Sequence, residues 1–231
     1  MQTQPSILVV LVLRAIRLWD RVRLAVQVRR HPGLKIDLRA STNLASAKFD
    51  LAPGAEVIIG SGVVTERIHH GVRFEVAQGG SLVIEDDVWL RTDIAPVFLR
   101  VGKGARIKIG AASQLSACML TSKKEVTVGQ FCLIGMGTRI FDSDQHSVDI
   151  DHPEVALPVH IEDHVWIAAD VTILRGVTVG DNSVVGTRSL VQRSVEPHTV
   201  VSGVPAKLYG KVGDRSGLAR GSDRTPGGKK G

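Results

Sequence analysis

A polar stretch near the middle of the sequence holds the side chains best suited to proton transfer. Residues 141–158 read FDSDQHSVDIDHPEVALP, which places His146 and His152 among four aspartates. A histidine has a pKa near neutrality, so it can remove a proton from a hydroxyl group at physiological pH. A carboxylate on the other ring nitrogen would fix the tautomer and stabilise the imidazolium. The segment DSDQHS supplies both kinds of group, with Asp142 and Asp144 as candidate orienting carboxylates.

A six-residue repeat lies on the C-terminal side of this stretch. A β-branched aliphatic residue recurs at every sixth position, and a second set of small residues follows each of them by four positions. The first set is Ile161, Ile167, Ile173, Val179, Val185 and Val191, and the second is Val165, Val171, Val177, Ser183, Ser189 and Val195. The first register also appears earlier, at Val128, Ile134 and Ile140.

A period of six fits neither a helix nor a simple alternating strand, but it fits a short strand followed by a turn. Three such units would close one triangular coil, and stacked coils would satisfy each other's backbone hydrogen bonds. Residues 141–158 interrupt the register, which resumes at Ile161. An insertion in a repeat fold is expected to be a surface loop, and loops on a rigid scaffold often carry function.

The six-residue repeat is densest in the segment PVHIEDHVWIAADVTILRGVTVGDNSVVGTRSLVQRSV, and the segment VVSGVPAK follows it. The chain resembles the hexapeptide-repeat acyltransferases over roughly residues 55–212, and most resembles their sugar O-acetyltransferase and polysaccharide-modifying branch. The resemblance implies an all-β, left-handed parallel β-helix. It also implies acetyl-CoA as acyl donor, a saccharide acceptor and a homotrimer with active sites between subunits. His146 matches the position of the family's general base, whereas His152 is expected at the rim of the loop.

The resemblance also implies a groove for the acyl donor. Trp166 would flank the pantetheine, Ala169 and Thr187 would offer backbone contacts, and Arg193 and Lys207 would bind the phosphates. The small residues Ala168 and Gly186 would permit close approach of the donor.

Two departures from the family pattern stand out. Many relatives have glycine at the position of Ala168, and no asparagine lies between Arg106 and Lys124, where the galactoside branch uses one.

Other functions stay open. The same fold hosts zinc enzymes with three histidine ligands, but His146 and His152 have no evident third partner, so we expect no metal. N-acylation of an amino- or nucleotide-sugar and a non-catalytic scaffold at a membrane surface are the alternatives to O-acetylation.

The two ends of the chain differ from its middle. The net charge is +6 for residues 1–35 and +3 for residues 213–231, against about −3 between them. A nucleic-acid-binding domain would instead carry a basic stripe with aromatic residues, so we expect no nucleic-acid partner. We therefore expect an N-terminal helical segment (1–35), a β-helix domain (36–212) with the 141–158 insertion, and a disordered basic tail (213–231).

Residues 6–30 predict an amphipathic helix. Either it packs on its own domain or on a neighbouring subunit, or it lies at a membrane surface as a peripheral contact. Its apolar run, residues 7–13, is far shorter than the roughly 20 residues that span a bilayer. No basic segment precedes this run and no small-residue cleavage site follows it, which argues against a signal peptide. Two cysteines are too few for a disulfide scaffold and fit a cytoplasmic protein, with a peripheral position on the inner membrane face as the alternative.

Overall fold

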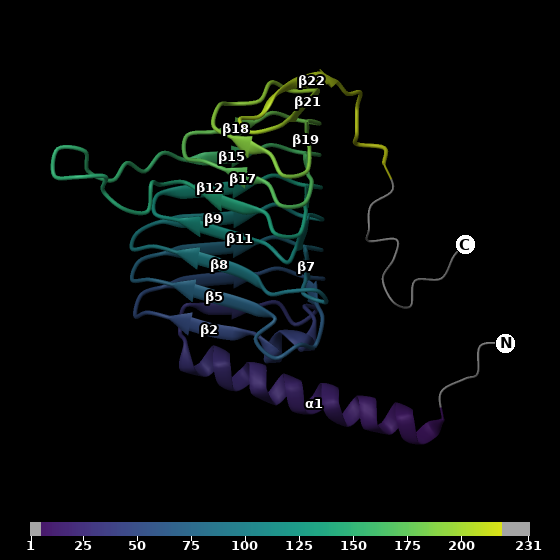
Figure 1. Cartoon of the computed structure of the whole chain (residues 1–231). Helices are drawn as coiled ribbons and strands as arrows, with labels where there is room; N and C mark the ends of the chain where they lie inside the picture. The colour runs from purple at the N-terminus through teal and green to yellow at the C-terminus, as the bar shows by residue number, and fades with distance from the viewer. Residues whose placement is uncertain (1–5, 219–231) are drawn as a thin grey trace.

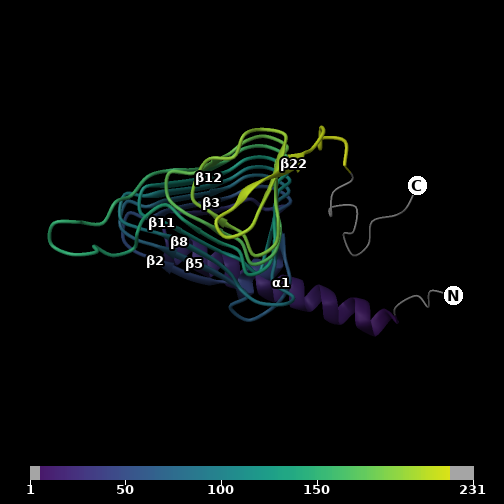
Figure 2. The same ribbon diagram turned by 45° about the horizontal axis from the view of Figure 1, so that its top comes forward.

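The chain folds into a triangular prism of stacked parallel strands with one long helix at its N-terminal end (Figures 1 and 2). The structure is a computed structural model, and it describes residues 6–218. Successive strands join a first, a second and a third sheet in turn, so that each strand pairs in parallel with the strand one coil further on. These are the stacked coils that the six-residue repeat predicts, in the left-handed parallel β-helix that the family resemblance implies.

The three sheets are named here by the order in which a coil visits them. The first contains β1 (Leu34–Ile36), β3 (Glu56–Ile59), β6 (Ser81–Ile84), β9 (Arg106–Ile109), β12 (Glu125–Val128), β15 (Val159–Ile161) and β18 (Thr178–Val179). The second contains β4 (Val64–Thr65), β7 (Trp89–Arg91), β10 (Gln114–Ser116), β13 (Leu133–Ile134), β16 (Trp166–Ile167), β19 (Val184–Val185), β21 (Thr199–Ser202) and the antiparallel β22 (Lys207–Lys211). The third contains β2 (Lys48–Leu51), β5 (Val72–Val76), β8 (Val97–Val101), β11 (Met119–Ser122), β14 (Arg139–Phe141), β17 (Thr172–Ile173) and β20 (Leu190–Val191).

The predicted register of the repeat is confirmed. The six aliphatic residues from Ile161 to Val191 are between 0% and 2% exposed, and they line the interior of the prism. The companion positions are buried as well, and the two serines among them have hydrogen-bond partners at the corners. Ser183 Oγ donates to the carbonyl of Glu196 (2.8 Å), and Ser189 Oγ donates to the carbonyl of Gly186 (2.7 Å). The narrow interior therefore accepts small polar side chains only where a nearby carbonyl satisfies them.

The predicted insertion leaves the prism between β14 and β15, at the corner that joins the third sheet to the first (Figure 1). Phe141 is the last residue of β14, so the loop itself comprises residues 142–158. The next coil continues in register, since β14 pairs with β17 and β12 pairs with β15.

The N-terminal helix α1 (Ile7–Arg30) lies across the first coils, next to the short 3₁₀ helix η1 (Thr42–Ser46). Its single buried residue is Asp20, whose two oxygens accept hydrogen bonds from Arg67 Nε (2.8 Å) and Nη2 (3.1 Å). Among residues 6–218, no helix is long and apolar enough to cross a membrane.

The C-terminal end of the described chain turns back along the prism. The backbone N–H of Val212 donates to the carbonyl of His198, and Arg215 reaches the outer face of the second sheet. The sequence predicts disorder from residue 213, whereas residues 213–218 lie against the fold here through the contacts of Arg215 with Asn182 and His164. Residues 219–231, the rest of the predicted tail, lie outside the described residues.

Candidate active site

The loop that carries His146 is fixed at its start by Asp142. This carboxylate is fully buried and accepts three hydrogen bonds of 2.7 Å, from Ser122 Oγ and from the backbone N–H groups of Lys123 and Lys124. Both oxygens are thus engaged at the end of β11, and neither is hydrogen-bonded to His146. The structure gives Asp142 the geometry of a loop anchor rather than that of the orienting carboxylate that the sequence predicts.

Asp144 ties the loop to the next coil. One of its oxygens accepts from Arg175 Nε, and the other accepts from the backbone N–H of Val155 (3.3 Å), on the returning arm of the loop. The hydrogen bond from the Arg175 guanidinium holds the pKa of the Asp144 carboxyl below its ordinary value. Asp144 is therefore a charged link between the two arms of the loop and the scaffold, and it too is not bonded to His146.

A third contact fixes the backbone next to His146. Lys123 Nζ donates to the carbonyl of Gln145 (2.9 Å) and to Glu154 Oε2 (2.8 Å). The same hydrogen bond from Lys123 lowers the pKa of Glu154. Gln145 has a positive φ of 68° and donates through its side chain to Ser143 Oγ (2.7 Å). His146 thus follows a backbone that is held from two sides.

The two loop histidines have different surroundings. The His146 side chain is exposed, and no residue in the range 6–218 hydrogen-bonds its imidazole. His152 instead pairs with Asp149: its Nδ1 lies 2.7 Å and 2.9 Å from the two carboxylate oxygens. The hydrogen bond from His152 lowers the pKa of Asp149. The histidine–carboxylate pair that the sequence predicts for His146 therefore occurs at His152, with Asp149 three residues before it.

A pocket of about 510 Å³ lies where the loop leaves the prism. It is lined by Phe141, Ser143, Asp144, Gln145, Leu174, Arg175 and Gln192. Arg193, the residue after Gln192, is exposed at this same corner between the third and first sheets. The predicted phosphate ligand Arg193 thus lies on the side of the prism that carries the loop.

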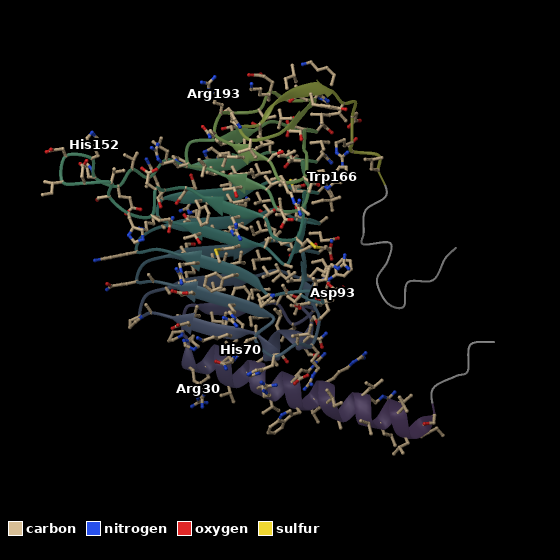
Figure 3. The ribbon with its side chains drawn as sticks, in the orientation of Figure 1. Arg30, His70, Asp93, His152, Trp166 and Arg193 are labelled. Carbon is tan, nitrogen blue, oxygen red and sulfur yellow. The ribbon has the colours of Figure 1, made fainter. Side chains whose placement is uncertain are left out.

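The other predicted donor residues lie elsewhere on the prism. Trp166 is at the start of β16, and it is 43% exposed on the outer face of the second sheet. Four of the other residues lie where strands of the second sheet end, at the corner with the third sheet: Ala168, Ala169, Gly186 and Thr187. The fifth, Lys207, is the first residue of β22. Figure 3 shows Trp166 and the loop residue His152 on opposite sides of the molecule. One chain therefore does not bring the predicted base and the predicted donor groove together.

The small residues at this corner have a structural cause. A Cβ built on Gly135 would lie 2.5 Å from the backbone carbon of Ala168, and one on Gly186 would lie 2.6 Å from Ser202 Oγ. Such distances are shorter than any ordinary contact, so coil stacking itself demands small residues there. Ala168 is only 9% exposed, so its methyl group adds little to the outer surface. The small residues alone are thus no evidence for a donor.

Arg215 is a residue of this face that the sequence does not single out. Its guanidinium carbon lies 5.5 Å from the centre of the Trp166 ring. Its backbone N–H donates to Asn182 Oδ1 (2.7 Å), and its Nε donates to the carbonyl of His164 (3.2 Å). Burial lowers the pKa of Arg215, although it stays a cation at neutral pH. A fixed positive charge therefore lies against the indole of Trp166, which the family resemblance places beside the acyl donor.

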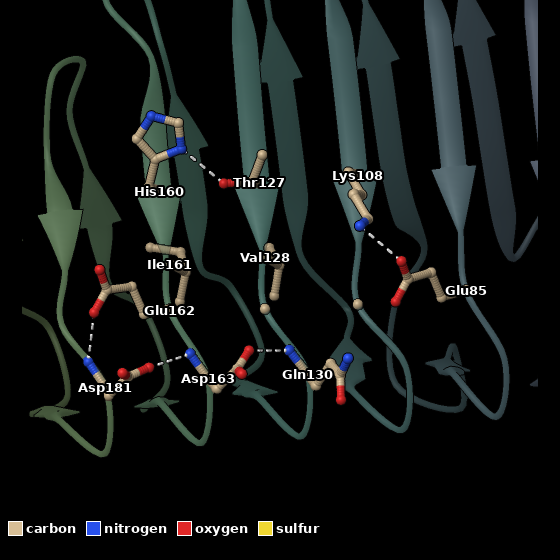
Figure 4. Close-up of a pocket in the computed structure, with 12 residues that line it drawn as sticks. Glu85, Lys108, Thr127, Val128, Gln130, His160, Ile161, Glu162, Asp163 and Asp181 are labelled. Carbon is tan, nitrogen blue, oxygen red and sulfur yellow. Dashed lines mark hydrogen bonds and ion pairs between the residues drawn. The ribbon is translucent and has the colours of Figure 1, made fainter.

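A second pocket, on the first sheet, has a structural explanation (Figure 4). Its carboxylates accept backbone N–H groups at the corners of the stacked coils. Asp163 accepts from Gln130 (2.7 Å), Asp181 accepts from Asp163 (2.8 Å), and Glu162 accepts from Asp181 (2.9 Å). These acids stabilise the stacking of coils.

Metal-ligating clusters and free thiols are the remaining candidates for chemistry among the described residues. Within residues 6–218 no cluster of three or more His, Cys, Asp or Glu side chains could hold a metal ion. Cys118 and Cys132 are buried, and burial raises the pKa of each thiol to about 12. Neither is a ready nucleophile at neutral pH.

Comparison with known proteins agrees with the architecture. The family profile described as bacterial transferase hexapeptide (six repeats) matches residues 158–193, the most regular coils of the prism. Over these coils the chain is similar to the hexapeptide-repeat transferases. Galactoside O-acetyltransferase of Escherichia coli K12 is 27% identical over 156 residues, which are 64% of this chain and 75% of that protein.

Two further comparisons cover different parts of the chain. Chloramphenicol acetyltransferase of Agrobacterium fabrum is 46% identical over 59 residues, 26% of this chain and 28% of that protein. The crystal structure of the polySia-specific acetyltransferase NeuO superposes with a TM-score of 0.56 at 23% identity, over 75% of this chain and 79% of that one. The first likeness concerns a short repeat segment, and the second concerns the fold.

Proposed function

We propose that the protein transfers an acetyl group from acetyl-CoA to a hydroxyl group of a saccharide, with His146 as the general base. Its relatives from Escherichia coli and Agrobacterium fabrum are both named acetyltransferases, and the first is named for galactosides. The observation that carries the proposal is the interruption of the repeat. It is a loop whose backbone is pinned on both sides of an exposed histidine, by Asp142 and Lys123 before it and by Glu154 after it.

In the proposed reaction, His146 removes the proton of the acceptor hydroxyl as the oxygen attacks the thioester carbonyl carbon. A C–O bond forms, the C–S bond breaks, and the CoA thiolate leaves and takes up the proton. Backbone N–H groups near the thioester would stabilise the oxyanion. Asp142 and Asp144 take part as positioning residues, since their oxygens hold the loop to Lys124 and Arg175.

The acyl donor would lie along Trp166. The neighbouring corner backbone at Ala169 and Thr187 would bind the pantetheine. Lys207 and Arg215 of the same copy would bind the phosphates of the donor, together with Arg193 from the loop side of the neighbouring copy. Because the loop and Trp166 face opposite sides of one prism, the loop of one copy must meet the Trp166 face of another. A homotrimer satisfies this need with three equivalent sites.

We further propose a cytoplasmic location. Cys118 and Cys132 are unpaired, and free thiols persist in a reducing compartment.

The test is a reaction of purified protein with acetyl-CoA and a panel of mono- and oligosaccharides, together with amino-sugars. Free thiol is measured by absorbance, and the products are identified by mass spectrometry. We expect thiol release that depends on a saccharide, and a product with one acetyl group that mild alkali removes, as for an ester. An alkali-stable amide would instead show N-acylation. Absence of release with every acceptor, together with no binding of acetyl-CoA by calorimetry, would leave the scaffold function in place of the enzyme.

A further inference from the structure

The two halves of α1 have different surroundings. The C-terminal half is attached to the prism through the buried Asp20, which pairs with Arg67, and through Leu24, which packs against the core. The N-terminal half extends past the prism in both views (Figures 1 and 2). No residue from Ile7 to Trp19 is buried. About half of the helix is therefore without a partner within the described chain.

The unpartnered half begins with an apolar tip, residues 7–13. Successive residues of a helix point in directions about 100° apart, so seven consecutive apolar residues cover its whole circumference. Ile7 is 81% exposed and Leu8 is 71% exposed, and the side chains of Leu11, Val12 and Leu13 are exposed as well. A groove on a folded protein covers one side of a helix, whereas the acyl chains of a lipid layer surround it. The tip therefore fits a fluid apolar phase better than a protein groove.

Basic residues follow the tip directly. Arg14, Arg17 and Arg21 occupy the next turns, and the nearest acid, Asp20, is already paired with Arg67 and Arg23. The tip has a length of about 10 Å, so a tip that enters along its axis reaches the boundary of headgroups and acyl chains, where interfacial helices bury their apolar faces by roughly 5–10 Å. Trp19, 63% exposed, lies among the arginines, and tryptophan favours the headgroup region. Charge and length together select a bilayer with anionic headgroups.

We propose that residues 7–21 of α1 form a docking surface for an anionic lipid bilayer. The tip enters the headgroup–acyl boundary, and the three arginines bind lipid phosphates. Because the N-terminal half of α1 extends past the prism (Figure 1), the tip meets the lipid ahead of the folded coils. The loop with His146 lies several coils away (Figure 1) and stays open to solvent. This inference does not depend on the proposed transferase activity.

The test is sedimentation of the full chain with vesicles of phosphatidylcholine alone and of phosphatidylcholine mixed with phosphatidylglycerol. We expect binding to the mixed vesicles that weakens with added salt. The double variant Leu8→Glu, Leu11→Glu should bind at least about tenfold more weakly. The double variant Arg14→Gln, Arg17→Gln should also lose roughly tenfold or more. Leu38→Glu is the matched control, since Leu38 is 91% exposed outside the helix, and it should bind as the unaltered chain does.

Circular dichroism would verify that each variant keeps its helix and strands. Failure of the unaltered chain to bind either vesicle would overturn the proposal, and so would an equal loss in the Leu38→Glu control. Sedimentation velocity without lipid tests whether a second copy of this chain, rather than lipid, covers the apolar tip. The proposal predicts the same oligomeric mass with and without the Leu8 and Leu11 changes. A lower mass in the double variant would assign the tip to contacts between copies instead.

Discussion

At the scale of single residues, Asp142 is the clearest example of a residue that supports the proposed site and does not itself perform the chemistry. Its oxygens accept from Ser122, Lys123 and Lys124 in a fully buried position. Loss of such an acceptor leaves buried donors unsatisfied, each at a cost of about 1–3 kcal/mol. We expect Asp142→Ala to lower the free energy of unfolding by roughly 3 kcal/mol in urea titrations.

The control for this change is Asp149→Ala, in the exposed part of the same loop. Surface substitutions of this kind alter stability by less than about 0.5 kcal/mol. Equal urea midpoints for the Asp142 variant and the unaltered chain would show that the three hydrogen bonds do not hold the loop.

Asp144 leads to a prediction about pH. Because Arg175 lowers the pKa of Asp144 in the folded protein, this pair stabilises the loop above the ordinary aspartate pKa and loses its effect as the pH falls below about 4. A carbon-13 NMR titration of Asp144 should show a midpoint below the ordinary value. In Arg175→Met the midpoint should rise towards that value. A midpoint unchanged by Arg175→Met would contradict the assigned cause.

Sequence reasoning at this scale placed a histidine and carboxylates in one loop, but not their pairing. Asp142 and Asp144 turn to Lys123 and Arg175, which are distant in sequence, and the direction of a loop side chain depends on such partners. The Asp149–His152 pair is local, yet the resemblance to a family drew attention to His146.

At the scale of elements, the repeat was predictable because its cause is local. Each coil repeats the same inward aliphatic residue, so the periodicity of Ile161 to Val191 specifies strand, turn and register at once. No comparable sequence pattern predicts the path of residues 213–218. Their composition is that of a solvated tail, and Arg215 is held by Trp166, Asn182 and His164, which come together on this surface when the chain folds.

The corner between the second and third sheets provides a test of coil stacking. A Cβ at Gly135 would meet the backbone of Ala168 at 2.5 Å, so Gly135→Ala must displace one coil relative to the next. We expect a loss of about 2 kcal/mol in the free energy of unfolding, the usual range for overpacking. Gly210→Ala in β22 is the matched control, because a Cβ there meets no atom within 4 Å. Similar losses in both variants would show that packing at the corner is not the cause.

At the scale of the whole molecule, the separation of the loop from Trp166 requires a second copy of the chain for the proposed site. Mixed assemblies test this. We expect His146→Ala and Trp166→Ala chains to be nearly inactive when each is assembled alone. Co-expressed, they should recover a sizeable part of the activity, because some interfaces then combine an intact loop with an intact Trp166 face. Chains carrying both changes, mixed with His146→Ala chains, are the control and should recover none. If the first mixture recovered no activity, His146 and Trp166 of the same chain would have to act in one site, against the proposal.

The central claim is that this hexapeptide-repeat protein uses His146 to activate an acceptor hydroxyl against acetyl-CoA. The most direct measurement is the rate of acceptor-dependent thiol release at saturating acetyl-CoA for the unaltered chain, His146→Ala and His152→Ala. Loss of a general base typically costs about 10²–10⁴-fold in rate. We predict a loss of this size for His146→Ala and a change within a few-fold for His152→Ala. The reverse pattern, or equal activity in all three proteins, would contradict the account.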